Sequence, residues 1–186
     1  MKIEYFHASK YGNGAMVAEE FKQQMAAQGV TVNVHHFREA RPKEMPPADL
    51  YMFSSPGRCG KPVWGMRRFL KKARLSAGTK CAILTTEGAP RPDKKTGRMP
   101  TEEELAKWQR IIPLMNEILQ EKGLVKVAQG KILVTGLKGP LEDGWQKKVR
   151  AFASQIPIRE TMDRPSSSGG TNETREGGHG CPYSPY

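Results

Sequence analysis

The chain has 186 residues, of which 37% are hydrophobic, and its formal net charge is +11 at pH 7. This length predicts one domain plus an appendage, and the charge predicts an anionic ligand or partner. No apolar run approaches the roughly 20 residues that cross a bilayer, and the amino terminus lacks a secretory pattern, so we expect a cytoplasmic protein. Cysteines are odd in number and widely spaced, which favours neither a disulfide framework nor a metal site: Cys59, Cys81 and Cys181.

The amino-terminal residues predict a strand that runs directly into a helix. An apolar run is followed by a Ser-Lys-Tyr-Gly-Asn-Gly turn at residues 9–14. Val17, Phe21 and Met25 then repeat at intervals of four, which predicts the buried side of a helix. Such a junction points backbone N–H groups and the positive end of the helix dipole at one place, which suits a phosphate. A tight turn without a ligand is the alternative interpretation.

The next part of the chain predicts two strands and a basic helix. Residues 31–37 are β-branched and partly alternating, and residues 50–55 form a continuous apolar run typical of a central strand. A turn rich in small and polar residues spans 54–62 and leads into a helix, for which Pro62 fits the first turn. The outer face of this helix is basic: Arg67, Arg68, Lys71, Lys72 and Arg74. A solvated face is the expected role of these charges.

Two further strands are separated by a long loop. Residues 80–86 predict a fourth strand, closed by Glu87 and Gly88, and residues 126–136 contain a fifth. The loop at 89–100 has three prolines, and a loop of this length is usually functional or mobile. It carries four cations: Arg91, Lys94, Lys95 and Arg98.

Two helices are expected in the second half of the chain. Thr101 and Glu104 form a capping box, and apolar spacings continue to Leu119, so we expect one long helix that Pro113 kinks. The last helix should bury four side chains: Trp145, Val149, Phe152 and Ile156. From residue 157 the apolar pattern stops, and the tail at 157–186, rich in glycine, serine and proline, is expected to be disordered.

This order of elements predicts an α/β fold. Five strands that alternate with helices imply right-handed crossovers and a doubly wound parallel sheet with helices on both faces. Ligands of such sheets bind beyond the carboxyl ends of the strands, where the strand order reverses. Three loops of small and polar residues leave that edge, namely 9–14, 54–61 and the loop after Thr85. In a sheet of order 2-1-3-4-5 these three loops are neighbours.

Two of the loops resemble motifs of the flavodoxin family. Residues 9–14, with Ala18 four residues on, resemble its phosphate loop, Ser/Thr-x-Thr-Gly-Asn-Thr-x-x-x-Ala. Residues 54–62 are similar to its flavin loop, Ser-Pro-x-Tyr-x-Gly-x-Pro. The resemblance covers residues 2–156 in the order and spacing of elements. It implies a flavodoxin-like domain over residues 1–156 and FMN as the cofactor.

The resemblance also implies which residues surround FMN. Those at the phosphate would be Ser9, Lys10, Tyr11, Gly12, Asn13 and Gly14. Those beside the isoalloxazine ring would be Ser55, Pro56, Gly57, Arg58, Cys59 and Gly60 on one margin and Thr86, Glu87 and Gly88 on the other.

Two residues depart from the family pattern. Gly14 stands where the family usually has a threonine that donates to the phosphate, and Arg58 stands where an aromatic residue often stacks on the ring. Arg58 can stack by its planar face or donate hydrogen bonds to the electron-rich edge of the ring. Either departure can instead mean that FMN binding is lost. Cys59 is expected to be a small buried residue, with a redox thiol as the alternative.

The leading hypothesis is an FMN-binding redox protein, which transfers electrons or acts as an FMN-dependent NAD(P)H oxidoreductase. Its basic charge then suggests an acidic redox partner or a nicotinamide dinucleotide, to which the loop at 89–100 could present its cations. The alternative is a flavodoxin-like domain that has lost FMN and binds a partner or another phosphorylated ligand. Nucleic-acid binding through the basic helix rests on charge alone, because no aromatic residues are interleaved with the cations.

Overall fold

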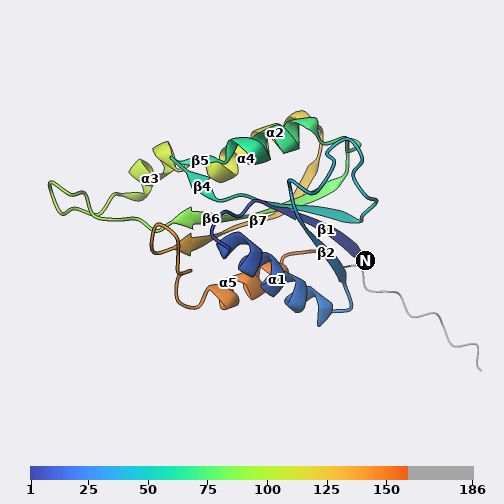
Figure 1. Cartoon of the computed structure of the whole chain (residues 1–186), viewed down its shortest axis with the longest axis horizontal. Coiled ribbons are helices and arrows are strands. Elements are labelled where there is room, and N and C mark those ends of the chain that lie inside the picture. Colours follow the sequence, from blue (N-terminus) through green and yellow to red (C-terminus); the bar gives the residue numbers. More distant parts are fainter. Residues whose placement is uncertain (159–186) are drawn as a thin grey trace, which may run out of the picture.

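A five-stranded parallel sheet forms the centre of the molecule (Figure 1). The structure, a computed structural model, describes residues 1–158, so the predicted disorder of the tail lies almost entirely outside the described residues. The strands are β1 (Lys2–His7), β2 (Thr31–His36), β3 (Leu50–Ser54), β6 (Lys80–Gly88) and β7 (Val125–Val134). Their order is β2-β1-β3-β6-β7, which confirms the predicted 2-1-3-4-5 sheet.

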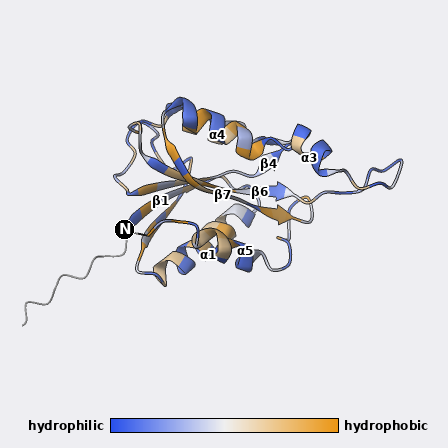
Figure 2. Cartoon of the chain, turned by 180° about the vertical axis from the view of Figure 1, so that it is seen from behind, coloured by the Kyte–Doolittle hydropathy of each residue, from blue (hydrophilic) through white to orange (hydrophobic). Residues whose placement is uncertain are grey.

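Helices cover both faces of this sheet, as predicted (Figure 1). The helices α1 (Asn13–Ala26) and α5 (Trp145–Ala153) lie on one face, and α2 (Trp64–Lys72) and α4 (Ile111–Glu121) lie on the other. Because side chains alternate along a strand, Tyr5 of β1 packs with Phe21 of α1, whereas Phe6 packs with Phe69 of α2. Figure 2 shows the strands largely in hydrophobic colours and the loop between β6 and α3 in hydrophilic ones. Each face of the sheet therefore has its own apolar core.

The predicted long helix is two helices, and the break does not fall at Pro113. α3 (Glu102–Trp108) begins with the predicted capping box and ends before Gln109, and α4 starts at Ile111. Pro113 lies in the first turn of α4, where its missing N–H costs no intrahelical hydrogen bond. The break instead follows from long-range contacts, since the Arg110 N–H donates to the Gly60 carbonyl at 2.6 Å.

The turn predicted at 54–62 contains a short antiparallel hairpin of β4 (Gly57–Arg58) and β5 (Lys61–Pro62). Cys59 and Gly60 form its tip with φ angles of 49° and 71°. The expectation of a buried Cys59 was wrong, because Cys59 is solvent-exposed at this tip, whereas Gly60 beside it is buried.

The expected place of Pro62 in the first turn of a helix and the expected burial of Trp145 were also wrong in detail. Pro62 pairs with Gly57 in the hairpin, and α2 begins two residues later, at Trp64. The Val63 N–H donates to the Ser55 hydroxyl at 3.1 Å, which fixes the chain ahead of the helix. Trp145 is only half-buried, because it occupies the first residue of α5.

A buried carboxylate joins β1 to the edge strand β2. Glu4 is 1% exposed, and its oxygens lie 2.8 Å from Asn33 Nδ2, 2.6 Å from His35 Nε2 and 2.9 Å from Lys2 Nζ. Burial raises the pKa of Glu4, but the hydrogen bonds from Asn33, Lys2 and His35 outweigh it and hold the pKa below its usual value. The ionised carboxylate therefore stabilises the pairing of β1 with β2.

We expect the Glu4→Gln substitution to lower the free energy of unfolding by about 1–3 kcal/mol at pH 7, because charged hydrogen bonds become neutral ones. A lowered pKa means that this stabilisation is lost as the pH falls through the pKa of folded Glu4, so the variant and the parent should converge in acid. Urea denaturation across a pH series measures both effects. The exposed Glu19→Gln control should change stability by no more than about 0.5 kcal/mol at any pH. A gap between Glu4→Gln and the parent that does not narrow in acid would contradict this role of the carboxylate.

The contact between the β4–β5 hairpin and the end of α3 provides a second test. A Cβ atom at Gly60 would overlap the carbonyl oxygen of Trp108, whereas a Cβ at Gly78 would meet no atom within 4 Å. Both glycines have a positive φ, so alanine is strained at either position. Gly60→Ala should therefore cost about 1–3 kcal/mol more than Gly78→Ala in thermal or urea unfolding, because only Gly60 is overpacked. Equal losses would mean that the hairpin is not held by α3.

Candidate functional site

The carboxyl edge of the sheet brings together the three loops that the sequence singled out. The Ala8 N–H donates to the Ser54 carbonyl at 3.0 Å, which ties the start of the first loop to the end of β3. The Thr86 N–H donates to the Ser55 carbonyl at 3.2 Å, and Pro56 forms a parallel bridge with Thr86. Residues 9–14, 55–60 and 86–88 are therefore adjacent at one edge.

The first of these loops ends in a helix start with unused donors. Gly12 has a φ of 88°, and α1 begins at the next residue. The Gly14 N–H donates to the Ser9 hydroxyl oxygen at 3.2 Å, and the Met16 N–H donates to the Gly12 carbonyl at 2.9 Å. The N–H groups of Asn13 and Ala15 have no acceptor among residues 1–158. Because Ser9 accepts that bond through its oxygen, its hydroxyl hydrogen can still be donated to a ligand.

Gly14 has a structural reason for being a glycine. A Cβ atom there would lie 3.0 Å from the Ala8 carbonyl oxygen and 3.3 Å from the Ser9 Cβ. A threonine at position 14 would push against the end of β1. The departure from the flavodoxin pattern thus accompanies close packing of position 14 against Ala8 and Ser9.

A fourth segment, between β7 and α5, reaches this loop and was missed in the sequence analysis. The Asn13 side chain donates through Nδ2 to the Lys138 carbonyl at 3.1 Å. Lys10 Nζ lies 5.3 Å and Lys138 Nζ 5.9 Å from the centre of the Tyr11 ring, so two cations lie close to the loop. The Gly-Leu-Lys-Gly-Pro sequence at 136–140, directly after the fifth strand, is the sequence feature that could have indicated this segment.

The segment between β7 and α5 comes close to the loop before α1 because of how the helices pack, and not because of the strand order. β1 and β7 are separated by two strands, but α1 and α5 pack on the same face of the sheet (Figure 1). Phe21 of α1 and Phe152 of α5 have ring centroids 5.8 Å apart. The chain between β7 and α5 therefore passes the amino terminus of α1.

Several ring-side residues of the prediction use their polar groups within the fold. The Ser55 hydroxyl accepts from the Val63 N–H and donates to the Pro56 carbonyl at 3.1 Å. Glu87 is buried and accepts a hydrogen bond from the Thr85 hydroxyl at 2.8 Å. Burial raises the pKa of Glu87, and Thr85 and Lys131 offset this only in part.

Other ring-side residues remain accessible. Gly57, Arg58, Cys59 and Gly88 are exposed, whereas Gly60 is covered by Trp108. The junction after α3 also reaches the end of β6, because the Gln109 side chain donates to the Gly88 carbonyl at 3.2 Å. The junction between α3 and α4 thus holds both segments that the sequence analysis expected beside the ring, which the sequence did not indicate.

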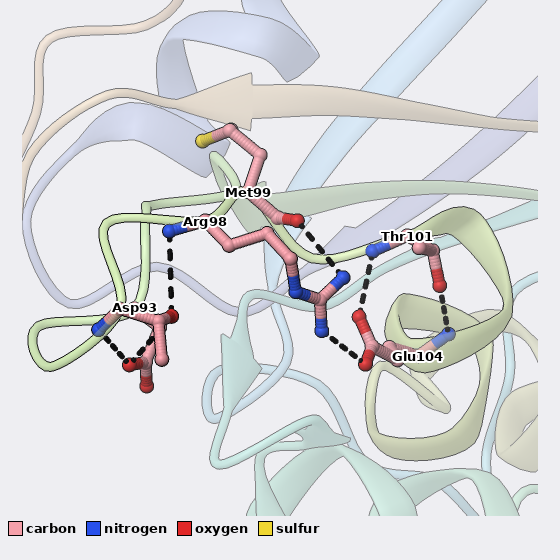
Figure 3. Close-up of polar contacts among 6 residues, drawn as sticks. Asp93, Arg98, Met99, Thr101 and Glu104 are labelled. Atoms are coloured by element: carbon pink, nitrogen blue, oxygen red, sulfur yellow. Dashed lines mark hydrogen bonds and ion pairs between the residues drawn. The ribbon is translucent and has the colours of Figure 1, made fainter.

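The loop predicted at 89–100 contains no helix or strand and has a local turn of its own (Figure 3). Asp93 Oδ1 accepts from the N–H groups of Lys95 and Thr96, both at 2.9 Å. Arg98 pairs with Glu104 of α3 at 2.6 Å. Near the start of the loop, Arg91 donates to the Thr135 carbonyl at 3.2 Å. These contacts give an exposed basic loop with fixed ends beside the candidate site.

The described part of the chain has neither a metal-ligand cluster nor a membrane-spanning helix. Among residues 1–158, no three His, Cys, Asp or Glu residues are grouped so that they could bind a metal ion. No helix in the same range has the length and apolar character needed to cross a membrane.

This chain resembles solved structures in fold, but comparisons of its sequence with family models and with curated proteins find no match. No protein-family model matches it, and no curated protein matches it in sequence. Flavodoxin 2 from Bacillus cereus superposes with a TM-score of 0.63 at 21% identity, over 83% of this chain and 97% of that one. A flavodoxin from the domain Archaea superposes with a TM-score of 0.60 at 18% identity, over 82% of this chain and 94% of that one.

A longer redox protein shares the same architecture. Rubredoxin oxygen:oxidoreductase from Desulfovibrio gigas gives a TM-score of 0.59 at 13% identity, over 83% of this chain and 35% of that one. The strand order β2-β1-β3-β6-β7 and the helices on both faces agree with these likenesses. The chain therefore has a flavodoxin-like fold.

Proposed function

We propose that the protein binds FMN at the carboxyl edge of its sheet and functions in electron transfer. The observation that carries this proposal is the turn between β1 and α1, where unused N–H groups and a serine hydroxyl lie together and two lysines lie close to Tyr11 of the same turn. Two other loops meet beside it, as a phosphorylated ligand with a flat ring would require. Flavodoxins and an oxygen-reducing oxidoreductase among the structural neighbours support a redox role.

The phosphate end of the site fits a bound anion. The N–H groups of Asn13 and Ala15 and the Ser9 hydroxyl would donate to the phosphate oxygens, where the positive end of the α1 dipole adds to the attraction. A Cβ at Gly12 would meet no atom within 4 Å, so the space above this backbone is open. Lys10 and Lys138 would add charge, which offsets the missing threonine hydroxyl at Gly14.

The ring end would be formed mainly by backbone. Residues 56–59 of the hairpin and residues 86–88 would lie along the two margins of the ring, while Ser55 and Gly60 hold the hairpin in place. The exposed Arg58 guanidinium could stack on the ring or donate to its edge. FMN itself, when bound, supplies the redox chemistry.

The second candidate is a domain of the same fold that binds a partner or another phosphorylated ligand and not FMN. It is favoured by Gly14, because the close packing of the turn crowds the threonine of the family pattern, and by Arg58 in place of an aromatic residue. The same phosphate-binding groups would then serve a different molecule.

Titration of the purified protein with FMN and with riboflavin tests the proposal. We expect FMN to bind with the two visible absorption bands of an oxidised flavin, and riboflavin, which lacks the phosphate, to bind more weakly. Ser9→Ala should raise the dissociation constant for FMN about ten- to a hundredfold and leave that for riboflavin nearly unchanged, because one hydrogen bond to a charged group is lost.

The control is Ser76→Ala, an exposed serine in the connection that leads to the amino end of β6. It should leave both dissociation constants unchanged. If FMN neither keeps its bands on the protein nor loses fluorescence on mixing, the redox function is wrong and the second candidate replaces it. An equal loss of FMN and riboflavin binding in Ser9→Ala would mean that the phosphate does not lie at this turn.

Addition of NADH or NADPH to the FMN-loaded protein without oxygen separates two forms of the proposed function. Bleaching of the flavin bands would identify an NAD(P)H oxidoreductase. Unchanged bands, with bleaching by dithionite, would identify an electron carrier that another protein reduces.

A further inference from the structure

Two exposed tryptophans flank the β4–β5 hairpin. Trp64 begins α2 directly after the hairpin and is 64% exposed, and Trp108 ends α3 and is 53% exposed. Trp108 also packs on the hairpin, since its Cε3 would lie 3.4 Å from a Cβ at Gly60. Large aromatic side chains exposed as neighbours of one element are typical of an interaction site and exceed what a solvated surface needs.

Cations lie on the hairpin and beside Trp64. Arg58 and Lys61 are exposed on the hairpin itself, and the Arg68 guanidinium lies 5.2 Å from the centre of the Trp64 ring. We call this group of five residues the hairpin patch: Arg58, Lys61, Trp64, Arg68 and Trp108.

Four of the five patch residues lie in a part of the sequence whose charged residues are all positive. Residues 50–86 contain eight lysines and arginines and no aspartate or glutamate. None of these cations takes part in an ion pair within residues 1–158, where the seven observed ion pairs lie elsewhere. Lys71 and Lys72 have a local role, because they lie in the last turn of α2 and complement the helix dipole. No such role explains Arg58 or Lys61.

We propose that the hairpin patch docks an acidic protein, with Trp64 and Trp108 as apolar anchors and the cations opposite carboxylates. Tryptophan and arginine are the residues most enriched among the anchors of protein interfaces, and complementary charge steers the encounter. That this acidic partner exchanges electrons with the protein rests on the proposed function, because Arg58 is shared with the ring-side loop. The docking of an acidic surface does not depend on FMN.

A protein partner fits this surface better than a nucleic acid does. Single-stranded nucleic acids follow a basic groove in which aromatic residues stack successive bases. The two tryptophans lie on either side of one hairpin. Two open grooves in the described chain run along β2 and beside Phe6, and their linings contain none of the patch residues.

The test measures binding of two acidic redox proteins, a [2Fe–2S] ferredoxin and a rubredoxin, to the full chain with and without FMN. We expect binding to weaken with added salt and Lys61→Glu/Arg68→Glu to reduce affinity about tenfold or more. Neither residue belongs to the proposed FMN site, so FMN binding reports that the variant is folded. Trp64→Ala should weaken binding several-fold without changing its dependence on salt, because it removes an apolar contact.

The matched control is Lys147→Glu/Arg150→Glu, which changes the net charge equally on exposed residues of α5, on the opposite face of the sheet (Figure 1). It should change affinity by less than about twofold, since screening limits the reach of distant charges. An equal loss in this control would overturn the proposal, because net charge alone would then explain binding. Absence of patch-dependent binding to both acidic proteins would also overturn it.

Two further probes separate the other kinds of partner. A poly(dT) oligonucleotide, or vesicles of phosphatidylcholine and phosphatidylserine, that bound more tightly than the acidic proteins and lost affinity in Lys61→Glu/Arg68→Glu would replace the proposal. A protein that fails to bind FMN but docks the acidic probes through the patch would disprove the proposed function and keep this inference. A protein that binds FMN without such docking would do the reverse.

Discussion

Parallel pairing of β1, β3 and β6 is the constraint on which the candidate site depends. These three strands run in the same direction, so their carboxyl ends all meet at one edge. The hydrogen bonds from Ala8 to Ser54 and from Thr86 to Ser55 continue this pairing just beyond the strands. Three segments that lie far apart in sequence are thus joined at one edge by backbone hydrogen bonds.

Contacts from outside the sheet then hold that surface in shape. The junction of α3 and α4 contacts the hairpin through Arg110 and Gly60 and contacts the end of β6 through Gln109 and Gly88. The segment between β7 and α5 holds the other side through Asn13 and Lys138. Ser55 links the hairpin to the start of α2. Three of the supporting residues, Gln109, Arg110 and Lys138, are therefore not among those that the resemblance to flavodoxins places around FMN.

The sequence predicted the elements with a strong local signal. Continuous apolar runs marked β3 and β6, intervals of four marked α1, and the capping box of Thr101 and Glu104 marked the start of α3. The break before α4 was missed because the Arg110 to Gly60 hydrogen bond joins residues fifty positions apart, which no local pattern records. Lys138 was missed for a similar reason, since its place beside Asn13 follows from the packing of α5 on α1. Local sequence patterns thus predicted most helices and strands, whereas long-range contacts determine which segments lie next to one another.

The loop after β6, at residues 89–100, separates two parts of the chain that pair with each other in the sheet. Both ends of this loop are fixed, by Ala89 on Val134 and by Arg98 on Glu104, whereas residues 91–99 are exposed. The segment before the loop provides four of the five strands, and the segment after it provides β7, which pairs along the whole of β6. The chain can therefore be opened within this loop to give new termini or two complementary fragments, because little of the core depends on its covalent continuity there.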